Sequence, residues 1–137
     1  MSNNISELRG LWRGKDADEG VWVFGDLLQI PILDNHGKIT ETKFAIMERT
    51  PVAKCRYVDK STLGECAGLC DKNSAQIFED DIIKAKEYTF QVNWNDEYAG
   101  FYPFFDQDYP IGYGICANIC EVIGNIHDNP ELLKGGK

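Results

Sequence analysis

Two pairs of cysteines have a spacing that could support chemistry. Cys66 and Cys70 form one C-x-x-x-C pair, Cys116 and Cys120 form the other, and Cys55 stands apart. Four thiolates complete a tetrahedral zinc site, so a metal centre is the first hypothesis to weigh. Residues four apart share a face of a helix, whereas on a strand they lie about 13 Å apart, too far to hold one ion.

The surroundings of these cysteines favour core packing over metal binding. Both pairs lie among glycine and β-branched residues, which are typical of strands and turns. A free cysteine packs as a small hydrophobic residue, so we expect the thiols to fill the core and expect no cofactor. The sequence alone leaves open whether the set of four ever binds metal.

Paired carboxylates offer little for catalysis. Asp80-Asp81 and Asp96-Glu97 could hold a divalent cation, but neighbours on a strand point to opposite faces, so each pair supplies one ligand at most. No G-x-S-x-G, H-E-x-x-H or P-loop motif occurs, and nothing marks His36 or His127 as a general base. We therefore assign no catalytic residue and no metal ligand, and favour a protein that is not an enzyme.

An aromatic-rich segment is the better candidate for a functional surface. Eight aromatic residues fall between Trp94 and Tyr113, and rings of this kind can stack on bases or cradle proline. Most of them are expected in the core, because each buries a large apolar area. The binding candidates are those that flank turns: Trp94, Tyr98, Tyr102 and Tyr109.

Net charge and composition disfavour some classes of binding partner. The 137 residues carry a formal net charge of -8, so the average surface repels phosphate backbones and anionic lipids. Non-specific DNA binding and a membrane role are therefore disfavoured. The start lacks the basic and apolar stretches of a secretory signal, and no apolar run is long enough for a spanning helix, which predicts a cytoplasmic protein.

The elements that must position these residues are short strands. Apolar and polar residues alternate in brief runs separated by turn residues, and no linker or low-complexity tract divides the chain. The first strand is expected to stop at Pro31, residues 64–74 are expected to be a long turn region, and Asn129 and Pro130 begin a short C-terminal helix. Strands are predicted in residues 21–31, 38–46, 52–58, 81–94 and 120–126.

Short strands with frequent turns predict a mainly β fold. Antiparallel strands must bury their apolar faces and limit exposed edges, which favours an SH3-like barrel or roll with a short C-terminal helix. We expect one domain over residues 1–137, with a closed sheet around Trp22, Phe90 and Val92.

Four stretches carry a resemblance to a known family. Residues 9–14 with 20–28, residues 58–73, residues 77–82 and residues 120–133 resemble, in order and spacing, the YopX-like family of phage and prophage proteins. The resemblance implies an SH3-like β-barrel roll with no established activity and brings no catalytic residues. Where the family usually has Lys, Gly and Gly, this chain has Cys70, Ser74 and Asp80. The turns at Ser74 and Asp80 are therefore expected either to be less tight or to use Asn73 and Asp80 in left-handed geometry.

These observations favour a phage accessory protein that binds a host or phage protein or assembles with itself. The alternative is a protein that binds, sequesters or, with a metal, processes nucleotides through its carboxylates or through Arg9 and Arg13.

Overall fold

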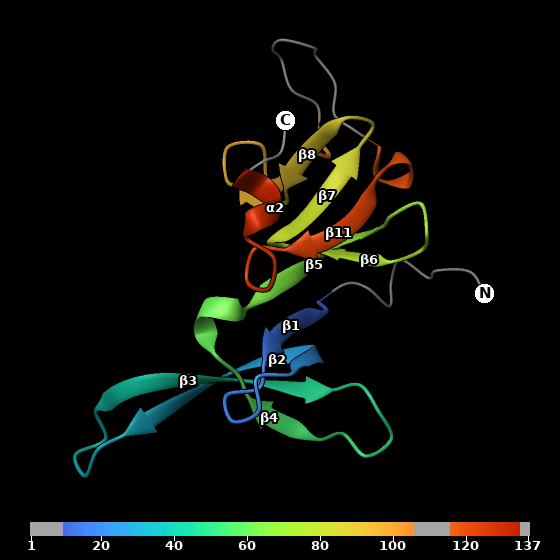
Figure 1. The fold of residues 1–137 in the computed structure, drawn as a ribbon. Helices are drawn as coiled ribbons and strands as arrows, with labels where there is room; N and C mark the ends of the chain where they lie inside the picture. Colours follow the sequence, from blue (N-terminus) through green and yellow to red (C-terminus); the bar gives the residue numbers. More distant parts are fainter. Residues whose placement is uncertain (1–9, 106–115, 135–137) are drawn as a thin grey trace. The chain divides into compact units, whose positions relative to one another are not determined.

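The computed structural model describes residues 10–105 and 116–134 (Figure 1). The chain divides into two compact units. The N-terminal unit is Gly10–Glu65, and the C-terminal unit begins at Cys66. The prediction of a mainly β protein with antiparallel strands is confirmed, as is the short C-terminal helix.

The N-terminal unit is an antiparallel sheet with strand order β4-β3-β2-β1-β5. Its largest part is the long hairpin of β2 and β3, which Figure 1 shows in blue and teal. The strands are β1 (Trp12–Lys15), β2 (Trp22–Leu33), β3 (Ile39–Glu48), β4 (Cys55–Tyr57) and the start of β5 (Gly64–Cys70), with a short 3-10 helix η1 (Lys60–Thr62).

The prediction that the first strand stops at Pro31 is wrong, because β2 continues to Leu33. Pro31 pairs with Thr42, at a position where β2 has no neighbour on its other side among the described residues. A proline is tolerated at such a place because the ladder does not use its missing N–H.

One face of this sheet carries the core of the unit. Val23, Ile46 and Val58 are buried there, and Trp12 and Phe44 pack against them. Trp22, which we expected at the centre of a single core, instead lies under two cations. The Arg13 guanidinium carbon lies 4.7 Å and the Lys15 ammonium 5.4 Å from its ring.

The described residues do not form the closed barrel expected from the sequence. A single bridge between Asp16 and Val58 joins the chain after β1 to the chain after β4 and curls the sheet around its core. β1 has four residues and β4 has three, which is too short to extend that bridge into a ladder. The sheet therefore remains open, with an edge strand at each end.

The C-terminal unit holds three small antiparallel groups: β11-β7-β8, β5 with β6, and β9 with β10. The prediction of a turn region over residues 64–70 is wrong, since β5 runs to Cys70. Gly68, with φ +80°, lies within the register shift between Cys66 and Cys70. The elements are β6 (Gln76–Phe78), β7 (Asp81–Ala85), β8 (Tyr88–Gln91), β9 (Asn93–Asn95), β10 (Gly100–Tyr102), η2 (Ala117–Ile119), β11 (Glu121–Asn125) and α2 (Glu131–Lys134).

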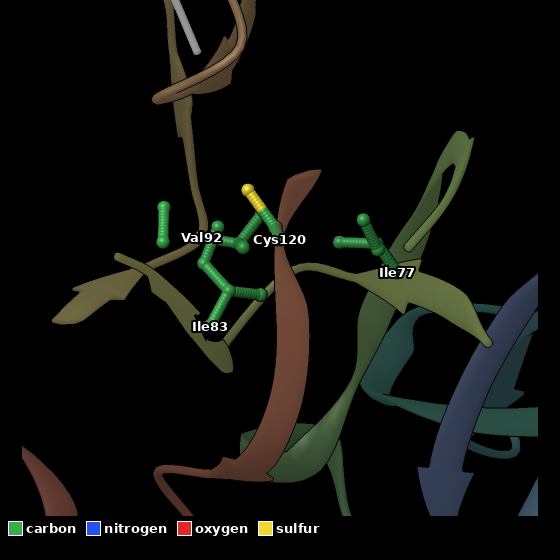
Figure 2. Close-up of a cluster of buried hydrophobic side chains, with 5 residues drawn as sticks. Ile77, Ile83, Val92 and Cys120 are labelled. Atoms are coloured by element: carbon green, nitrogen blue, oxygen red, sulfur yellow. The ribbon is translucent and has the colours of Figure 1, made fainter. Parts of the chain in front are cut away.

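A buried cluster lies at the centre of the C-terminal unit. Ile77, Ile83, Val92 and Cys120 each have 0% of their surface exposed and come from separate parts of the chain (Figure 2). Phe90 packs against this cluster from the side. The Cys120 thiol therefore serves as an apolar side chain, as the sequence predicted.

Two hairpin loops share one design. In the β2–β3 loop, Asp34 Oδ1 accepts the backbone N–H groups of His36 and Lys38 at 2.8 and 2.9 Å. In the β5–β6 loop, Asp71 Oδ1 accepts the corresponding groups two and four residues later, both at 2.8 Å. Each aspartate also donates its own N–H to the carbonyl four residues later. Such side-chain acceptors fix five-residue loops that would otherwise leave backbone donors unpaired.

The two loops have different residues at the same left-handed position, three residues after the aspartate. Gly37 occupies it in the first loop with φ +78°, and Ser74 occupies it in the second with φ 67°. The expected left-handed geometry at Asp80 is present, with φ 74°, but in the neighbouring loop Ser74 rather than Asn73 takes it. A residue with a Cβ pays a steric cost there that glycine does not.

Candidate functional site

The predicted binding residues fall on and around the β9–β10 hairpin of the C-terminal unit. Trp94 and Phe101 are direct cross-strand partners, with ring centroids 5.2 Å apart in an edge-to-face arrangement. The turn is fixed by Asn95, whose Oδ1 accepts the Tyr98 N–H at 2.9 Å. The Trp94 indole N–H donates to Asp96 Oδ1 at 2.6 Å.

Five rings in this region contact one another in sequence, and we call them the aromatic row. Tyr88 meets Phe90 at 6.4 Å, Phe90 meets Tyr102 at 6.0 Å, Tyr102 meets Phe105 at 6.2 Å, and Phe105 stacks on Tyr98 at 4.7 Å. Tyr88 and Tyr98, at the two ends, are 55% and 43% exposed, and the three central rings are half-buried. The row is thus anchored in the unit and still accessible.

The structure brings together two of the four predicted residues. Tyr98 and Tyr102 both contact Phe105 and belong to the row. Trp94 pairs with a neighbour of Tyr102 in β10, so alternation along the strand puts Trp94 and Tyr102 on opposite faces of the hairpin. Tyr109 lies outside the described residues.

Three members of the row were not among the predicted binding residues. Tyr88 and Phe90 lie in β8, and Phe105 follows β10. The alternation from Tyr88 to Trp94 indicated an apolar face. Only the packing of β10 against β8 residues shows that this face joins the turn aromatics.

Acidic residues are the sequence neighbours of the exposed rings Tyr88 and Tyr98. Within residues 86–98, Glu87, Asp96 and Glu97 are exposed, and Lys86 is the single basic residue. The local charge is therefore negative, as it is for the whole chain. This electrostatic environment repels phosphate and favours cationic groups beside the rings.

The cysteine pairs lie as strand and turn geometry dictates. Cys66 and Cys70 share strand β5, and Cys116 and Cys120 flank the short helix η2, with the Cys120 thiol 3.4 Å from the Cys116 carbonyl oxygen. Cys66 and Cys120 are buried, whereas Cys55 and Cys116 are exposed. Exposed thiols at these two positions differ from the core packing that the sequence predicted for them.

Two thiols are held in their neutral form. Burial is the main cause that raises the pKa of Cys120, followed by the Asp71 carboxylate and then by Cys116. The pKa of Cys70 is raised by burial first and by the same Asp71 carboxylate second. Metal binding and nucleophilic attack both need the thiolate, so these environments oppose both. Within the described residues, no three His, Cys, Asp or Glu side chains gather closely enough to hold an ion.

Buried carboxylates in the C-terminal unit are engaged by the backbone. Asp81 Oδ2 accepts the Phe78 N–H at 2.8 Å, and Asp71 Oδ2 accepts the Val122 N–H at 2.8 Å. Asp80 lies 3.3 Å from the His127 Nε2 and 3.3 Å from the Gln91 amide nitrogen. These contacts join loops to strands, which is a structural role.

In the N-terminal unit, Arg56 joins three carboxylates. Its guanidinium lies 3.1 Å from Asp16, 3.4 Å from Glu48 and 3.8 Å from Glu19. The pKa of Asp16 is lowered mainly by the backbone N–H groups of Glu19 and Asp18, and further by Arg56, against the opposing effect of burial. The hydrogen bond to Asp16, and then the one to Glu48, raises the pKa of Arg56. One cation thus faces three carboxylates, and the network ties the turn after β1 to β3 and β4.

These features define a class: a mainly β protein with an accessible aromatic row and, in the described ranges, no gathered catalytic or metal-binding side chains. A family model described as YopX protein matches residues 11–134, so the chain belongs to the YopX family. The resemblance seen in the sequence is thereby confirmed.

Other comparisons add little to this assignment. The chain is similar to the crystal structure of protein EF1440 from Enterococcus faecalis, with 24% identity, 89% of this chain and 96% of that chain covered, and a TM-score of 0.45. No curated protein matches the sequence. In the described part of the chain, no helix is long and apolar enough to cross a membrane.

Proposed function

We propose that this YopX-family protein is a non-enzymatic accessory protein of a bacteriophage or prophage, acting in the host cytoplasm by binding an extended segment of a host or phage protein. Residues 1–137 serve as one functional domain, in which the curled N-terminal sheet corresponds to an SH3-like roll. The family membership of the chain supports the phage setting, and the aromatic row supports the binding role.

The observation that carries this proposal is the aromatic row. Five connected rings with exposed ends offer a rigid apolar surface that loses little conformational entropy on binding. Grooves lined by aromatic rings commonly hold proline-rich or otherwise extended segments. Tyr98 and Tyr102 remain the proposed contact residues, joined by Tyr88.

Charge supports a protein partner rather than a nucleic acid. Glu87, Asp96 and Glu97 beside the rings favour an extended segment with lysine or arginine near its apolar residues. A nucleic acid would place phosphates against the same carboxylates, which disfavours binding.

The test compares the wild-type chain with a Tyr88→Ser/Tyr98→Ser variant and with a Phe24→Ser control. Phe24 is likewise an exposed aromatic residue but belongs to the N-terminal unit. Each protein is used to capture partners from phage-infected cell lysate, which are quantified by mass spectrometry. We expect at least a tenfold loss of one partner with the double variant and retention with the control. A partner set unchanged by the double variant would refute the proposal.

Self-assembly is the second mode of binding that the row could support. Light scattering on the same three proteins distinguishes it, since a wild-type oligomer that the double variant loses would make a second copy the partner. The nucleotide alternative predicts retention or turnover of nucleotides by the purified chain with and without Mg²⁺. Either result, self-assembly through the row or binding of nucleotides, would refute the proposal of a host or phage protein partner.

A further inference from the structure

An open strand edge lies in the N-terminal unit, whereas the aromatic row belongs to the C-terminal unit. β3 has ten residues, but β4 pairs only with Ala45, Ile46 and Met47. The last hydrogen bond on this side is donated by Val58 N–H to the Phe44 carbonyl at 2.9 Å. Before Phe44, the outer edge of β3 has no strand beside it among the described residues.

Strand alternation shows which backbone groups this edge presents. Phe44 and Glu48 direct theirs toward β4, since Glu48 N–H donates to Lys54 at 2.8 Å. Thr42 has the same parity, so its N–H and C=O point outward along the open edge. The N–H can donate to an added strand, and the C=O can accept from it.

The opposite edge of the hairpin is protected. β1 pairs with β2 only from Trp22 to Gly25, so the end of β2 is also without a neighbour in the described chain. Pro31 stands on that edge and has no N–H to give. Proline on an edge strand blocks the addition of another strand. A further strand can therefore add to the hairpin at the β3 edge but not at the β2 edge beside Pro31.

A cavity of about 360 Å³ adjoins the open edge at Thr42. Phe44, Tyr57 and Val58 supply its apolar lining, Lys43 and Lys60 supply its cations, and the turn after β1 contributes Asp18. In strand addition, such pockets take alternate side chains of the incoming segment and give specificity to contacts that the backbone makes with any sequence. The volume lies at the lower end of the range of binding pockets.

The two lysines make this cavity a place for an anion. Lys43 Nζ lies 5.3 Å from the Tyr57 ring, and Lys60 Nζ lies 5.3 Å from the Phe44 ring. Neither has a carboxylate within ion-pair distance in the described residues, whereas Arg56 has three. Lys43 and Lys60 outnumber Asp18, so the lining of the cavity carries a net positive charge on a chain of charge -8.

We propose that the β3 edge and this cavity bind an extended acidic segment of a partner protein. The segment adds as a strand beside Thr42, packs its apolar side chains against Phe44 and Tyr57, and sets a carboxylate against Lys43 or Lys60. This site goes beyond the function proposed above, because it uses another unit of the chain, backbone pairing and the opposite charge preference.

The test selects ligands for the full chain from a random ten-residue peptide library displayed on messenger RNA, followed by affinity measurement on the enriched peptides. Thr42→Pro removes the outward N–H without touching the β2–β3 ladder, as Pro31 does on the other edge. Lys43→Glu/Lys60→Glu reverses the charge, and Lys54→Glu, an exposed lysine outside the cavity, is the matched control. Circular dichroism confirms that each variant folds.

We expect enriched peptides that are acidic and rich in β-branched residues. Their affinity should fall at least tenfold with Thr42→Pro and with the double charge reversal, and less than twofold with Lys54→Glu. Enrichment of basic peptides, enrichment of none, or binding unaffected by Thr42→Pro would overturn the proposal. So would self-association that Thr42→Pro abolishes, which would assign the edge to a second copy, or displacement of the peptide by inorganic phosphate alone.

Discussion

Replacing Asp71 with asparagine tests how much one buried carboxylate contributes to the C-terminal unit. Its two oxygens accept three backbone N–H groups, from Asn73, Ala75 and Val122, each at 2.8 Å. An asparagine has only one acceptor oxygen, so either orientation of its amide leaves at least one buried N–H facing an NH₂ group. The loop and β11 would no longer be held by the same side chain.

The expected cost of Asp71→Asn follows from these three bonds. A hydrogen bond to a charged acceptor contributes about 1.5–3 kcal/mol, and one such bond is lost. The others weaken from charged to neutral acceptors, at about 0.5 kcal/mol each. The free energy of unfolding of the C-terminal unit should therefore fall by about 3 kcal/mol.

Asp34→Asn is the matched control, because Asp34 occupies the same position in the β2–β3 loop. Both of its N–H donors reach a single oxygen, Oδ1, which the asparagine carbonyl can replace in an exposed site. The expected cost is below about 1 kcal/mol. Urea unfolding of the reduced protein is followed through the NMR signals of the indole N–H groups, where Trp94 reports the C-terminal unit and Trp12 and Trp22 the other.

Equal and small decreases in the free energy of unfolding for the two asparagine variants would refute this reasoning about the buried carboxylate. A second readout is the thiol of Cys120, whose raised pKa owes part of its shift to the Asp71 charge. Asp71→Asn should therefore lower the pKa of that thiol, followed by NMR titration of the Cys120 Cβ signal, and Asp34→Asn should leave that pKa unchanged.

Three further predictions concern backbone strain, thiol access and acid stability. Ser74→Gly is expected to stabilise the protein by about 0.5–1 kcal/mol, because Ser74 has φ 67°; an unchanged or lower urea midpoint would contradict the steric argument. At neutral pH, iodoacetamide should label the exposed Cys55 rapidly and Cys120 only on unfolding, and mass spectrometry showing equal rates would exclude a core role for Cys120. Asp16 has a lowered pKa, chiefly through the Glu19 N–H, so its stabilising effect is present above its ordinary pKa of about 3.9 and is lost as pH falls through the folded value. The difference in unfolding free energy between wild type and Asp16→Asn should thus shrink below pH of about 4, and a difference that does not vary with pH would show that the charge is irrelevant.

Local sequence signals predicted most of the elements but not their partners. Alternation located β2, β3, β7, β8 and β11, and Asn129 and Pro130 located the helix, because these signals depend on neighbours along the chain. Gly64 and Gly68 predicted a turn over residues that form strand β5 in the structure. In the fold, Gly68 lies in a bulge within β5, which only the paired strands reveal.

For the candidate sites too, the sequence predicted some residues but not their spatial neighbours. The sequence indicated Tyr98 and Tyr102, but it could not show that Phe105 joins them or that Trp94 faces the other way. The β3 edge gave no sequence signal at all, since an edge is defined by the strand that is missing beside it.

The sequence by itself determined the mainly β class, the family, the acidic net charge and the turns at residues 34–37 and 71–74. Each of these depends on composition or on residues a few positions apart, where steric and hydrogen-bonding preferences act directly. Only the tertiary structure decided that the sheets stay open, that Trp22 lies under two cations rather than in a core with Val92, and that Thr42 borders a cationic cavity. Those outcomes depend on contacts between residues distant in sequence, whose free energies are small, compete with one another and are fixed only when the whole chain packs.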